Sequence, residues 1–276
     1  MSKSSSNTIS IIIATLNADA TLQSCIDSVQ RQTWHKKEII VCDGGSDDQT
    51  IDILKCNDSV LAYWHSEPDK GIYNAWNKGL SHATGDWICF LGADDYFWDE
   101  KVLEKYMTSA NQVYPEIRVI YGQVALVSKD GFVVRRIGAP WEQEKRRFRQ
   151  VSCLPHPGLL CHRDVFEQYG QFEDSFRIAG DYEFLLRELL TRDAHFVPEL
   201  VTVGMRTGGI SSRSSTIRLG YEECRMAQRM HNIHWPGFRW LLGYAFALGR
   251  WTIAKVIGER SVDQIISNMH SENKQK

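Results

Sequence analysis

The chain has 276 residues, a length that suits one large domain or one domain with an extension. It is 43% hydrophobic and 24% charged, with a formal net charge of -2, which is the composition of a soluble globular protein. A disordered or collagen-like chain is thereby excluded. The near-neutral charge gives no support to a nucleic-acid partner, and we expect none.

The cysteines and the start of the chain favour a reducing compartment. There are seven cysteines, and no two of them form a C-x-x-C pair of the zinc-ribbon or redox type. The simplest interpretation is a cytoplasmic protein. Residues 1–8 form a polar tail, and the apolar stretch after them is too short for a secretory signal. No run reaches the roughly 20 apolar residues that a membrane-spanning helix needs.

Up to about residue 110, strand-length apolar segments alternate with segments of helical period. This pattern is typical of βαβ units around a largely parallel sheet. Helices are expected at Thr21–Gln30 and at Thr50–Lys55, and Ser46 with Gln49 would open the second as a capping box. The expected strands are Ile9–Ala14, Glu38–Cys42, Ala62–His65 and Trp87–Leu91.

Beyond residue 119 the pattern changes to short strands, which indicates an α+β arrangement. Val124–Val127 and Phe132–Arg135 predict a hairpin that turns through Asp130 and Gly131. A helix over Asp181–Thr191 and a pair of short strands near residues 196 and 201 are expected next. The Gly/Ser-rich segment 207–215 then separates a main domain, 9–215, from a helical C-terminal extension, 216–276.

Polar side chains follow three of the expected strands. Thr15 and Asn17 follow the first strand, Asp43 the second, and Asp94 and Asp95 the fourth. In open α/β sheets, ligands bind outside the carboxyl ends of the strands, so these side chains predict a site. Carboxylates that lie close together repel one another, and a divalent metal with oxygen ligands is the usual remedy. An Asp-Asp pair alone would more often cap a turn, but the neighbouring strand ends favour the metal.

The phosphate-binding motifs of other nucleotide enzymes are missing. No G-x-G-x-x-G follows the first strand, and the chain contains no G-x-x-x-x-G-K-[ST]. Dinucleotide oxidoreductases and P-loop enzymes therefore lack support. A phosphate group held at Asp94 and Asp95 would be held through a metal, as expected of a nucleotide diphosphate that is the leaving group.

Four ordered motifs begin at or near these strands: ISIIIATLN from Ile9, EIIVCDGGSDD from Glu38, GIYNAWNKG from Gly71 and ATGDWICFLGADD from Ala83. Together they resemble glycosyltransferase family 2. The resemblance covers roughly residues 9–215 and implies the α/β GT-A fold, a Rossmann-like mixed, mostly parallel sheet flanked by helices. It divides the catalytic domain into a nucleotide-binding half, 9–110, and an acceptor half, 111–215.

The resemblance also implies roles for the residues at the strand ends. Thr15 and Asn17 would line the nucleoside pocket, and Asp43 would accept hydrogen bonds from the base. A carboxylate there suits the ring N–H of uracil or the N–H edge of guanine, and we favour UDP over GDP. Asp94 would bind the ribose hydroxyls and Asp95 a divalent metal, Mn²⁺ or Mg²⁺.

Further residues near these motifs refine the expected donor site. Lys70 is placed to approach the diphosphate as a mobile charge, with a solvated loop lysine as the alternative. Asn77 is interpreted as structural, fixing its helix against the strand that leads to Asp94. Gly92 stands where many relatives have an acidic residue, and Asn74 where those most similar have Asp. With fewer carboxylates, the roles of Asp94 and Asp95 are open to exchange.

The acceptor half contributes the segment from Gly180 to Arg187, which resembles the family's acidic motif. The resemblance implies that Asp181 is the general base, with Glu183 as the second candidate. Asp181 opens a helix and shares a face with apolar residues, so we expect it to point inward, and a capping aspartate is the alternative. Asp181 would remove a proton from the acceptor hydroxyl while the metal neutralises the departing diphosphate. One displacement inverts the sugar carbon.

Other elements of the acceptor half carry weaker hypotheses. His156 and Arg163 fall in the family's acceptor-side region, although a lone histidine is more often a packed structural residue. The loop 208–212 could close over the donor as a lid because its glycines permit large backbone changes. A plain linker is the alternative.

The expected partners are a nucleotide-sugar donor and a saccharide or lipid-linked saccharide acceptor, in the assembly of a surface polysaccharide or glycan. Two other classes were weighed. A metal-dependent nucleotidyltransferase would carry a Gly-rich, basic phosphate loop after the first strand, and none is present. A non-catalytic nucleotide-sugar binding protein is disfavoured because four acidic site residues occur together.

The extension contains an aromatic and basic stretch from residue 235 to 257. Two interpretations are open for it. The helix could lie in a membrane interface, on the inner face, or it could pack its aliphatic side on the catalytic domain or on a second subunit of a homo-oligomer. On a helix from Gly237, the aliphatic side carries Leu241, Ala245, Leu248 and Thr252, the opposite side Arg239 and Arg250, and the flank Trp240, Tyr244 and Trp251.

Overall fold

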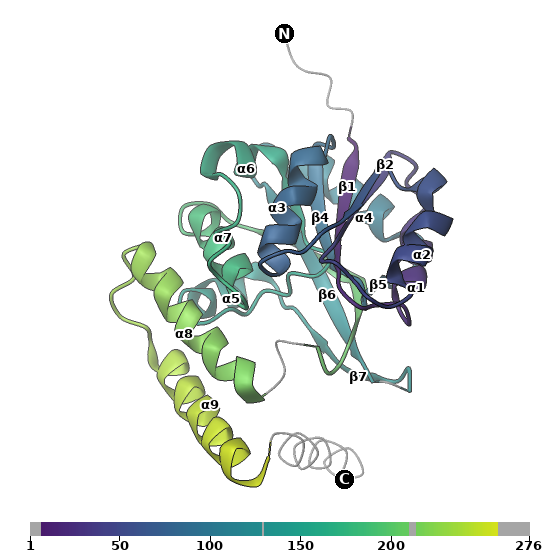
Figure 1. Cartoon of the computed structure of the whole chain (residues 1–276). Coiled ribbons are helices and arrows are strands. Elements are labelled where there is room, and N and C mark those ends of the chain that lie inside the picture. The colour runs from purple at the N-terminus through teal and green to yellow at the C-terminus, as the bar shows by residue number, and fades with distance from the viewer. Residues whose placement is uncertain (1–6, 129, 210–213, 259–276) are drawn as a thin grey trace.

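The computed structural model describes residues 7–128, 130–209 and 214–258. Within these residues a nine-stranded sheet forms the centre of the molecule (Figure 1). The strand order is β3-β2-β1-β4-β8-β6-β9-β5, and β7 pairs with β6 off this path. The sheet is mixed: the first four strands pair parallel, as do β6 and β9, and the other pairs are antiparallel.

The first four strands are confirmed, each within one residue of the expected ends. Parallel pairing joins β1 to β2, β1 to β4 and β2 to β3. The inner segments of β1, β2 and β4 are buried on both faces, which is why these strands are nearly continuous apolar runs, whereas the edge strand β3 is half-buried. The bounds are β1 Ile9–Thr15, β2 Lys37–Asp43, β3 Tyr63–Ser66 and β4 Trp87–Gly92.

The second half of the sheet introduces antiparallel pairing. The predicted hairpin is confirmed, because β6 and β7 pair antiparallel. The predicted pair of short strands is wrong: residues 195–206 form one strand, β9, parallel to β6. Glu199 has a positive φ of 61° within it, and this irregularity breaks the apolar alternation into two pieces. The bounds are β5 Tyr96–Phe97, β6 Val119–Val127, β7 Val133–Ile137, β8 Leu160–His162 and β9 His195–Arg206.

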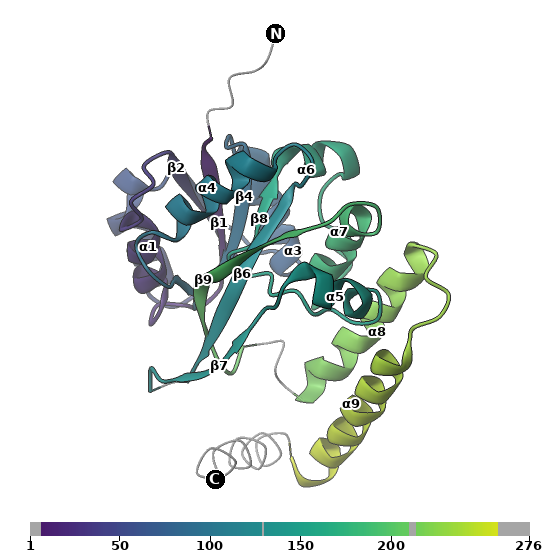
Figure 2. The same cartoon turned by 180° about the vertical axis from the view of Figure 1, so that it is seen from behind.

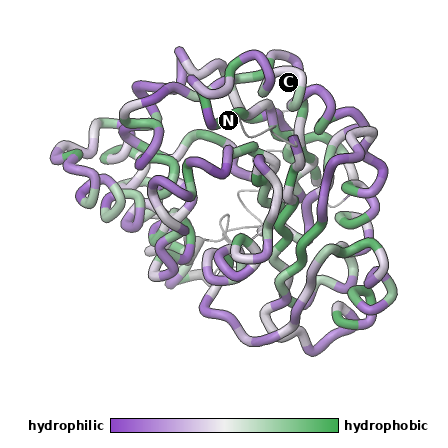
Figure 3. Tube along the Cα trace, turned by 90° about the horizontal axis from the view of Figure 1, so that it is seen from above, coloured by the Kyte–Doolittle hydropathy of each residue, from purple (hydrophilic) through white to green (hydrophobic). Residues whose placement is uncertain are grey.

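Helices cover both faces of the sheet, as the two opposite views show (Figures 1 and 2). On β1, Ile12 packs into the core beneath α3, α6 and α7, whereas Ile11 and Ile13 pack into the core beneath α1 and α4. This alternation follows from the two-residue period of a strand. Seen from above, the outer loops are mostly hydrophilic (Figure 3). The bounds are α1 Leu22–Gln30, α3 Ile72–His82, α4 Val102–Val113, α6 Arg163–Tyr169 and α7 Gly180–Leu189.

The capping box expected at the helix α2, Thr50–Cys56, does not form. The N-cap Gln49 makes no side-chain cap hydrogen bond, and Asp48 Oδ1 accepts from the Thr50 N–H at 2.9 Å. Ser46 is engaged elsewhere, because its hydroxyl donates to the buried carboxylate of Asp43. A buried carboxylate is the stronger acceptor, so it outcompetes the local cap.

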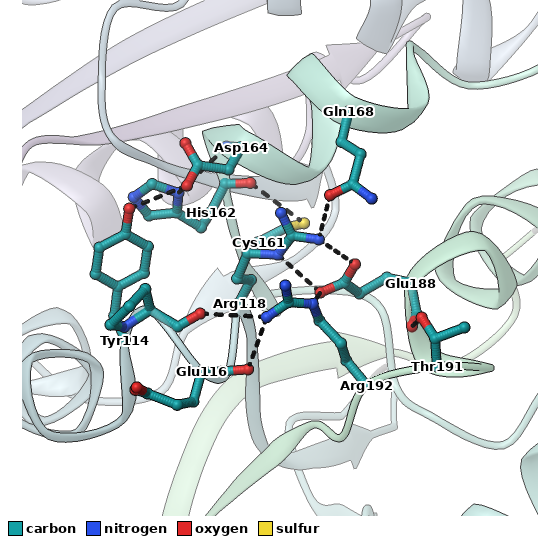
Figure 4. Close-up of polar contacts among 11 residues, drawn as sticks. Tyr114, Glu116, Arg118, Cys161, His162, Asp164, Gln168, Glu188, Thr191 and Arg192 are labelled. Atoms are coloured by element: carbon teal, nitrogen blue, oxygen red, sulfur yellow. Dashed lines mark hydrogen bonds and ion pairs between the residues drawn. The ribbon is translucent and has the colours of Figure 1, made fainter.

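The helix α7 is attached to the sheet at its C-terminal end by a buried ion pair (Figure 4). Arg118, directly before β6, donates from Nε to Glu188 Oε1 at 2.9 Å and also contacts Oε2. The same guanidinium donates to Gln168 of α6 at 2.8 Å. The hydrogen bond with Glu188 raises the pKa of Arg118, so the guanidinium stays charged.

The C-terminal extension consists of α8, Ser214–Met230, and α9, Phe238–Ile257, which lie against each other beside α5, Trp141–Phe148, and α7 (Figure 1). Cys224 and Ala227 of α8 are buried in the same core as the apolar face of α7. Among the described residues, no helix is both long and apolar enough to cross a membrane.

Within the described residues α9 packs on protein, but through its aromatic flank and not through its aliphatic side. The membrane interface and the homo-oligomer stay predictions. The aromatic flank, which was to lie at headgroup level, faces α8: Trp240 Nε1 donates to the Tyr221 carbonyl at 2.8 Å, and Arg218 lies 4.7 Å from the Trp251 ring centroid. The aliphatic side, which was to pack on protein, is exposed, with Leu241 at 38% and Leu248 at 40%. The aromatic rings of α9 fill the space between α9 and α8. Hydrophobic period alone does not show which side of a helix will pack on its neighbour.

Candidate functional site

Three of the predicted site segments meet at the carboxyl edge of the parallel strands. The strand register pairs Thr15 with Asp43 and Ala14 with Gly92. The Gly44 N–H donates to the Thr15 carbonyl at 2.9 Å, which extends the β1–β2 pairing into the loop. The polar residues that follow β1, β2 and β4 therefore lie side by side, at the position where an open α/β sheet binds ligands.

Asp43 organises the loop after β2. Its carboxylate is buried and accepts hydrogen bonds from the N–H groups of Gly45 at 3.1 Å and Ser46 at 2.9 Å. It also accepts from the hydroxyls of Ser46 and, at 2.6 Å, Ser66. Because it binds four donors, the carboxylate holds the loop in one conformation. A nucleobase would therefore meet a loop whose shape is already fixed.

Thr15 and Asn17, at the end of β1, differ in whether their side chains already have hydrogen-bond partners. Thr15 is buried, and its hydroxyl has no hydrogen-bond partner among the described residues. Such a group costs free energy until a partner arrives, so it suits a ligand contact. Asn17 is instead committed to the loop: its Oδ1 accepts from the Asp47 N–H at 3.0 Å, and its backbone φ is 50°. The local loop uses the side-chain oxygen that the nucleoside was expected to use.

Lys70 lies on the surface near the loop of Asp43. Its side chain is exposed, and its N–H donates to Asn74 Oδ1 at 3.4 Å. The preceding Asp69 binds the Gly71 N–H at 2.7 Å and approaches Gly44 so closely that a Cβ there would meet its carboxylate at 2.7 Å. The segment before α3 therefore packs on the nucleotide-side loop, and Lys70 is a mobile charge at its rim.

The acidic pair after β4 has one buried and one exposed member. Asp95 is 5% exposed, and its Oδ1 has no hydrogen-bond partner among the described residues. Burial, together with the neighbouring Asp94 carboxylate, raises the pKa of Asp95 well above its usual value. Asp94 is exposed. The Asp95 oxygen is therefore open to a further partner, and a cation beside the two carboxylates would lower the cost of burying it.

The donor atoms at this position fit the divalent metal that the resemblance implies. The described residues contain no cluster of three or more metal-binding side chains, so at this position the two carboxylates would be the protein's ligands. Hard dications are commonly held by one or two carboxylates, with substrate phosphates and water completing the sphere. The unpartnered Asp95 oxygen is the atom that would bind such an ion, with Asp94 beside it.

Gly92 explains why a third carboxylate is absent. A Cβ at this position would lie 2.9 Å from Asp94 Oδ1 and 3.2 Å from Asp95 Oδ2. With the side chains of Asp94 and Asp95 in these positions, an acidic residue at position 92 would push against both. The glycine at position 92, where many relatives have an acidic residue, therefore fits the positions of the two aspartate side chains.

Arg206, which the sequence analysis missed, faces the acidic pair from β9. Its Nε donates to the Asp94 carbonyl at 3.1 Å, and its guanidinium lies 5.7 Å from the Tyr96 ring centroid. Its charge opposes the rise in the pKa of Asp95. No local signal marks this arginine, because the contact depends on β5 pairing with β9 across more than a hundred residues.

Asp181 lies in the first turn of α7 and is held by α3. Its Oδ1 accepts from the Tyr73 hydroxyl at 3.3 Å and from the Tyr182 N–H at 2.8 Å. Burial and the Asp181 charge raise the pKa of Tyr73 well above its usual value, so the phenol remains a donor. Among the described residues, the second oxygen, Oδ2, has no hydrogen-bond partner, which leaves it available to accept a proton.

Glu183, the second candidate base, is occupied. It is 1% exposed, and Arg187 and His231 bind it, the imidazole Nε2 lying 2.9 Å from Oε1. Burial alone would raise the pKa of Glu183, but these hydrogen bonds bring it below its usual value. A carboxylate that holds two partners and resists protonation is a poor proton acceptor, so the geometry favours Asp181.

The other acceptor-side residues differ in how they are held. His156 is buried between Trp76 and Phe90, with ring centroids 5.1 and 5.7 Å away, and burial lowers its pKa. Its Nδ1 has no hydrogen-bond partner among the described residues, so its contact with the acceptor stays a prediction. Arg163 donates to the carbonyls of residues 83 and 85, both at 2.8 Å. Asn77 is structural as predicted, but its partner is the Phe172 backbone, at 2.8 and 3.0 Å, and not a strand.

The expected lid loop falls partly outside the described residues, since residues 210–213 are not described. Of the described part, Gly208 has a positive φ of 100°. A Cβ at Gly209 would lie 4.0 Å from Asp94 Oδ2. The loop after β9 therefore starts beside the acidic pair, and its role as a lid stays a prediction.

The fold is shared with solved structures of sugar-nucleotide enzymes. Residues 1–349 of S. aureus TarS in complex with UDP-GlcNAc superpose with a TM-score of 0.61 at 16% identity, covering 88% of this chain and 72% of that one. The mannosyltransferase PcManGT from Pyrobaculum calidifontis, in complex with GDP-Man and Mn²⁺, gives 0.58 at 15% identity, covering 95% and 79%. The longer TarS chain is spanned over 39% of its length. These likenesses show the fold, which is that of GT-A glycosyltransferases.

Sequence comparison then identifies the family. The model described as "Glycosyl transferase family 2" matches residues 10–170, more than half of the chain, so the chain belongs to glycosyltransferase family 2. It is 33% identical over 196 residues to a PGL/p-HBAD biosynthesis glycosyltransferase of Mycobacterium bovis (strain BCG / Pasteur 1173P2), covering 68% of this chain and 74% of the relative. It is also 33% identical over 126 residues to the UDP-Glc:alpha-D-GlcNAc-diphosphoundecaprenol beta-1,3-glucosyltransferase WfgD of Escherichia coli, covering 45% and 49%.

Proposed function

We propose that this glycosyltransferase uses a divalent metal and a UDP-sugar, and that it transfers the sugar with inversion to a hydroxyl of a saccharide or lipid-linked saccharide. The observation that carries the proposal is the unpartnered, buried oxygen of Asp95 beside Asp94 at the carboxyl edge of the sheet. A nucleotidyltransferase or a non-catalytic binding protein would not need Asp181 as well, held with one oxygen free.

The mechanism assigns a task to each side chain of the site. Asp95 and Asp94 would hold the metal, which when bound supplies charge neutralisation to the departing diphosphate. Thr15 and the Asp43 loop bind the nucleoside. Asp181 Oδ2 takes the proton of the acceptor hydroxyl, while Tyr73 holds the carboxylate in place. One carboxylate acting on the face opposite the nucleotide gives a single displacement, hence inversion.

A UDP donor is supported by chemistry and by two comparisons. The carboxylate of Asp43 suits the ring N–H of uracil, which would replace one of the four donors that the carboxylate holds in its loop. The name of WfgD specifies UDP-Glc, and the TarS complex contains UDP-GlcNAc, whereas the PcManGT complex contains GDP-Man. The sugar itself can be a hexose or an N-acetylhexosamine on these grounds.

Thermal stabilisation by a donor panel tests the proposal. UDP-glucose, UDP-N-acetylglucosamine and GDP-mannose are each added with Mn²⁺ or with chelator, since a ligand that binds only the native state raises Tm. We expect at least one UDP-sugar to raise Tm with Mn²⁺ and not with chelator. A rise that is largest with GDP-mannose would refute the UDP assignment, and an equal rise in chelator would refute the metal.

A lipid-linked acceptor leads us to propose peripheral binding to an anionic membrane surface through α9. The exposed apolar residues of this helix follow helical spacing and make one stripe, which carries Phe238, Leu242, Phe246, Ile253 and Val256. Leu242 is 74% and Phe246 70% exposed. An apolar stripe of this kind suits insertion among acyl chains.

Basic residues beside this stripe favour anionic lipid as the occupant. One hollow next to the start of α9 is lined by Arg146 and Arg149 together with Trp235 and Phe238. A second is lined by Arg147, Tyr221, Arg239 and Leu242. Arginines at the edge of an apolar stripe meet lipid phosphates at headgroup level.

Flotation with liposomes tests this part of the proposal. We expect the protein to float with vesicles that contain phosphatidylglycerol, less so at high salt, and the variant Leu242→Glu/Phe246→Glu to remain at the bottom. Phe132→Glu is the matched control, because Phe132 is 74% exposed on the β6–β7 hairpin, away from α9. Equal flotation of the α9 variant and the control would exclude α9 as the membrane surface.

A further inference from the structure

A carboxylate on α8, outside the family-matched residues, holds the chain segment that leads into α7. Glu223 is 6% exposed, and its oxygens accept from three successive backbone N–H groups. Oε1 accepts from Arg177 at 2.9 Å, and Oε2 accepts from Ile178 and Ala179 at 2.8 Å each. Three charge-assisted hydrogen bonds of this kind fix the path of the backbone directly before the helix.

The helix α7 has no side-chain cap of its own at this end. Its N-cap residue is Ala179, whose methyl group cannot accept a hydrogen bond. In a capping box, a glutamate of the same helix binds the N-cap N–H, and a negative charge there also complements the helix dipole. Glu223 supplies both from another helix, so α8 completes the N-terminus of α7.

We propose that Glu223 is a positioning residue for glycosyl transfer, holding Ala179 so that Asp181, two residues further on, faces the acceptor hydroxyl. The inference rests on the proposed role of Asp181 as general base. The role of Glu223 is to hold the backbone before α7, whereas Tyr73 holds the Asp181 carboxylate itself. Gly180 packs against the Tyr73 ring, where a Cβ would come within 2.8 Å, so the segment between the two anchors has little freedom.

The dependence of the rate on this anchor follows from the reach of a general base. Proton transfer needs the base within hydrogen-bond distance of the hydroxyl. A misplacement of about 1 Å costs about 10²-fold in rate, even when its cause lies away from the reacting atoms. Donor binding uses the carboxyl edge of β1, β2 and β4, which Glu223 does not touch. Loss of the Glu223 hydrogen bonds is therefore expected to lower kcat and to leave the affinity for the nucleotide unchanged.

The first test replaces Glu223 by glutamine. Glu223→Gln keeps the shape, but its amide nitrogen cannot accept, so at least one of the three bonds is lost. With UDP-glucose and a lipid-diphosphate-linked N-acetylglucosamine as probes, we expect kcat to fall about 10- to 100-fold. The Kd of UDP with Mn²⁺, measured by calorimetry, stays unchanged. A wild-type kcat, or a weakened UDP affinity that accounts for the loss, overturns the proposal.

Glu222→Gln is the matched control. Glu222 is the adjacent residue on α8, where it binds Arg218 one turn earlier in the same helix, and it accepts from the hydroxyl of Tyr244 on α9 at 3.1 Å. It tests whether any loss of a carboxylate from this helix lowers the rate. We expect wild-type kcat, and an equal fall in both variants would overturn a specific role for Glu223.

A double variant separates the positioning role from the base itself. If Glu223 acts through Asp181, then Asp181→Asn combined with Glu223→Gln is no slower than Asp181→Asn alone. If the fold-losses in kcat of the two single variants multiply in the double variant, the positioning role of Glu223 is overturned, and the role of Asp181 as general base is not affected. A wild-type rate for Asp181→Asn refutes the proposed base and the positioning role with it.

Should Glu223→Gln fail to fold, Glu223→Asp carries the test. It keeps the charge but shortens the side chain by one methylene, so the bonds to residues 177–179 lengthen without disappearing. We expect a kcat below wild type with unchanged UDP affinity. A wild-type kcat, or loss of UDP binding, overturns the proposal.

Discussion

The competing assignment of Glu183 as general base gives the sharpest test of the site. We expect Glu183→Gln to destabilise the fold without a large effect on the reaction. The glutamate is buried and binds Arg187 and His231, whereas Asp181 keeps a free oxygen. The glutamine side chain has the same shape but no charge. Its amide nitrogen cannot accept a hydrogen bond from Arg187 or His231.

The size of the effect follows from the bonds that are lost. A hydrogen bond to a charged group contributes about 1.5–3 kcal/mol, and the amide loses at least one of the set. Its lower desolvation cost offsets part of this, so we expect a loss of about 2–3 kcal/mol. At about 2–4 °C per kcal/mol for a protein of roughly this size, Tm falls by about 4–12 °C.

The pH dependence has a definite sign. Because the pKa of Glu183 is lower in the folded state than its ordinary value of 4.5, its contribution is present above that value and is lost as pH falls through the folded pKa. The difference in unfolding free energy between wild type and Glu183→Gln therefore shrinks in acid. Urea unfolding at pH 7.5 and pH 4 measures it, alongside kcat at a temperature where both proteins are folded. A variant with wild-type stability but a kcat lowered about 10²-fold or more would refute the structural role and make Glu183 the base.

Three further predictions concern the proposed site. Asp95→Asn abolishes transfer and removes the Tm increase that Mn²⁺ gives with UDP, because a neutral ligand holds a hard dication poorly; full activity in excess chelator would contradict it. Asp181→Asn retains UDP affinity but lowers kcat by roughly 10²–10⁴-fold, and near-normal turnover with weakened UDP binding would make Asp181 a structural cap. Asp43→Ala weakens UDP and UDP-sugar binding equally, since the loss lies at the nucleoside; unchanged UDP affinity by calorimetry would remove Asp43 from the pocket.

The parallel half of the fold could be predicted because its signals are local. The strands β1, β2 and β4 are short apolar runs followed by polar residues, and burial on both faces makes such runs easy to recognise. Parallel pairing then brings their ends together, so the location of Asp43, Asp94 and Asp95 at one edge followed from the pattern. The register of Thr15 against Asp43 confirms that arrangement.

The features that were missed depend on contacts between distant segments. Ser46 was assigned to a local cap, but the buried Asp43 takes its hydroxyl. Arg206 and Glu223 act on residues far away in the chain, and neither belongs to a motif. The sequence did not show that the aromatic flank of α9 packs on α8, because helical period shows where faces lie, and not which one finds a partner.

The anchor of α7 in α8 has a consequence for synthesis on the ribosome. Chains fold from the N-terminus as they emerge, so the nucleotide-binding strands can assemble well before Glu223 is translated. At that stage the segment before Asp181 has no carboxylate to hold it. With the roles proposed above, a partly made chain could bind the sugar nucleotide while the base was still unplaced, and transfer would begin only after α8 had been made.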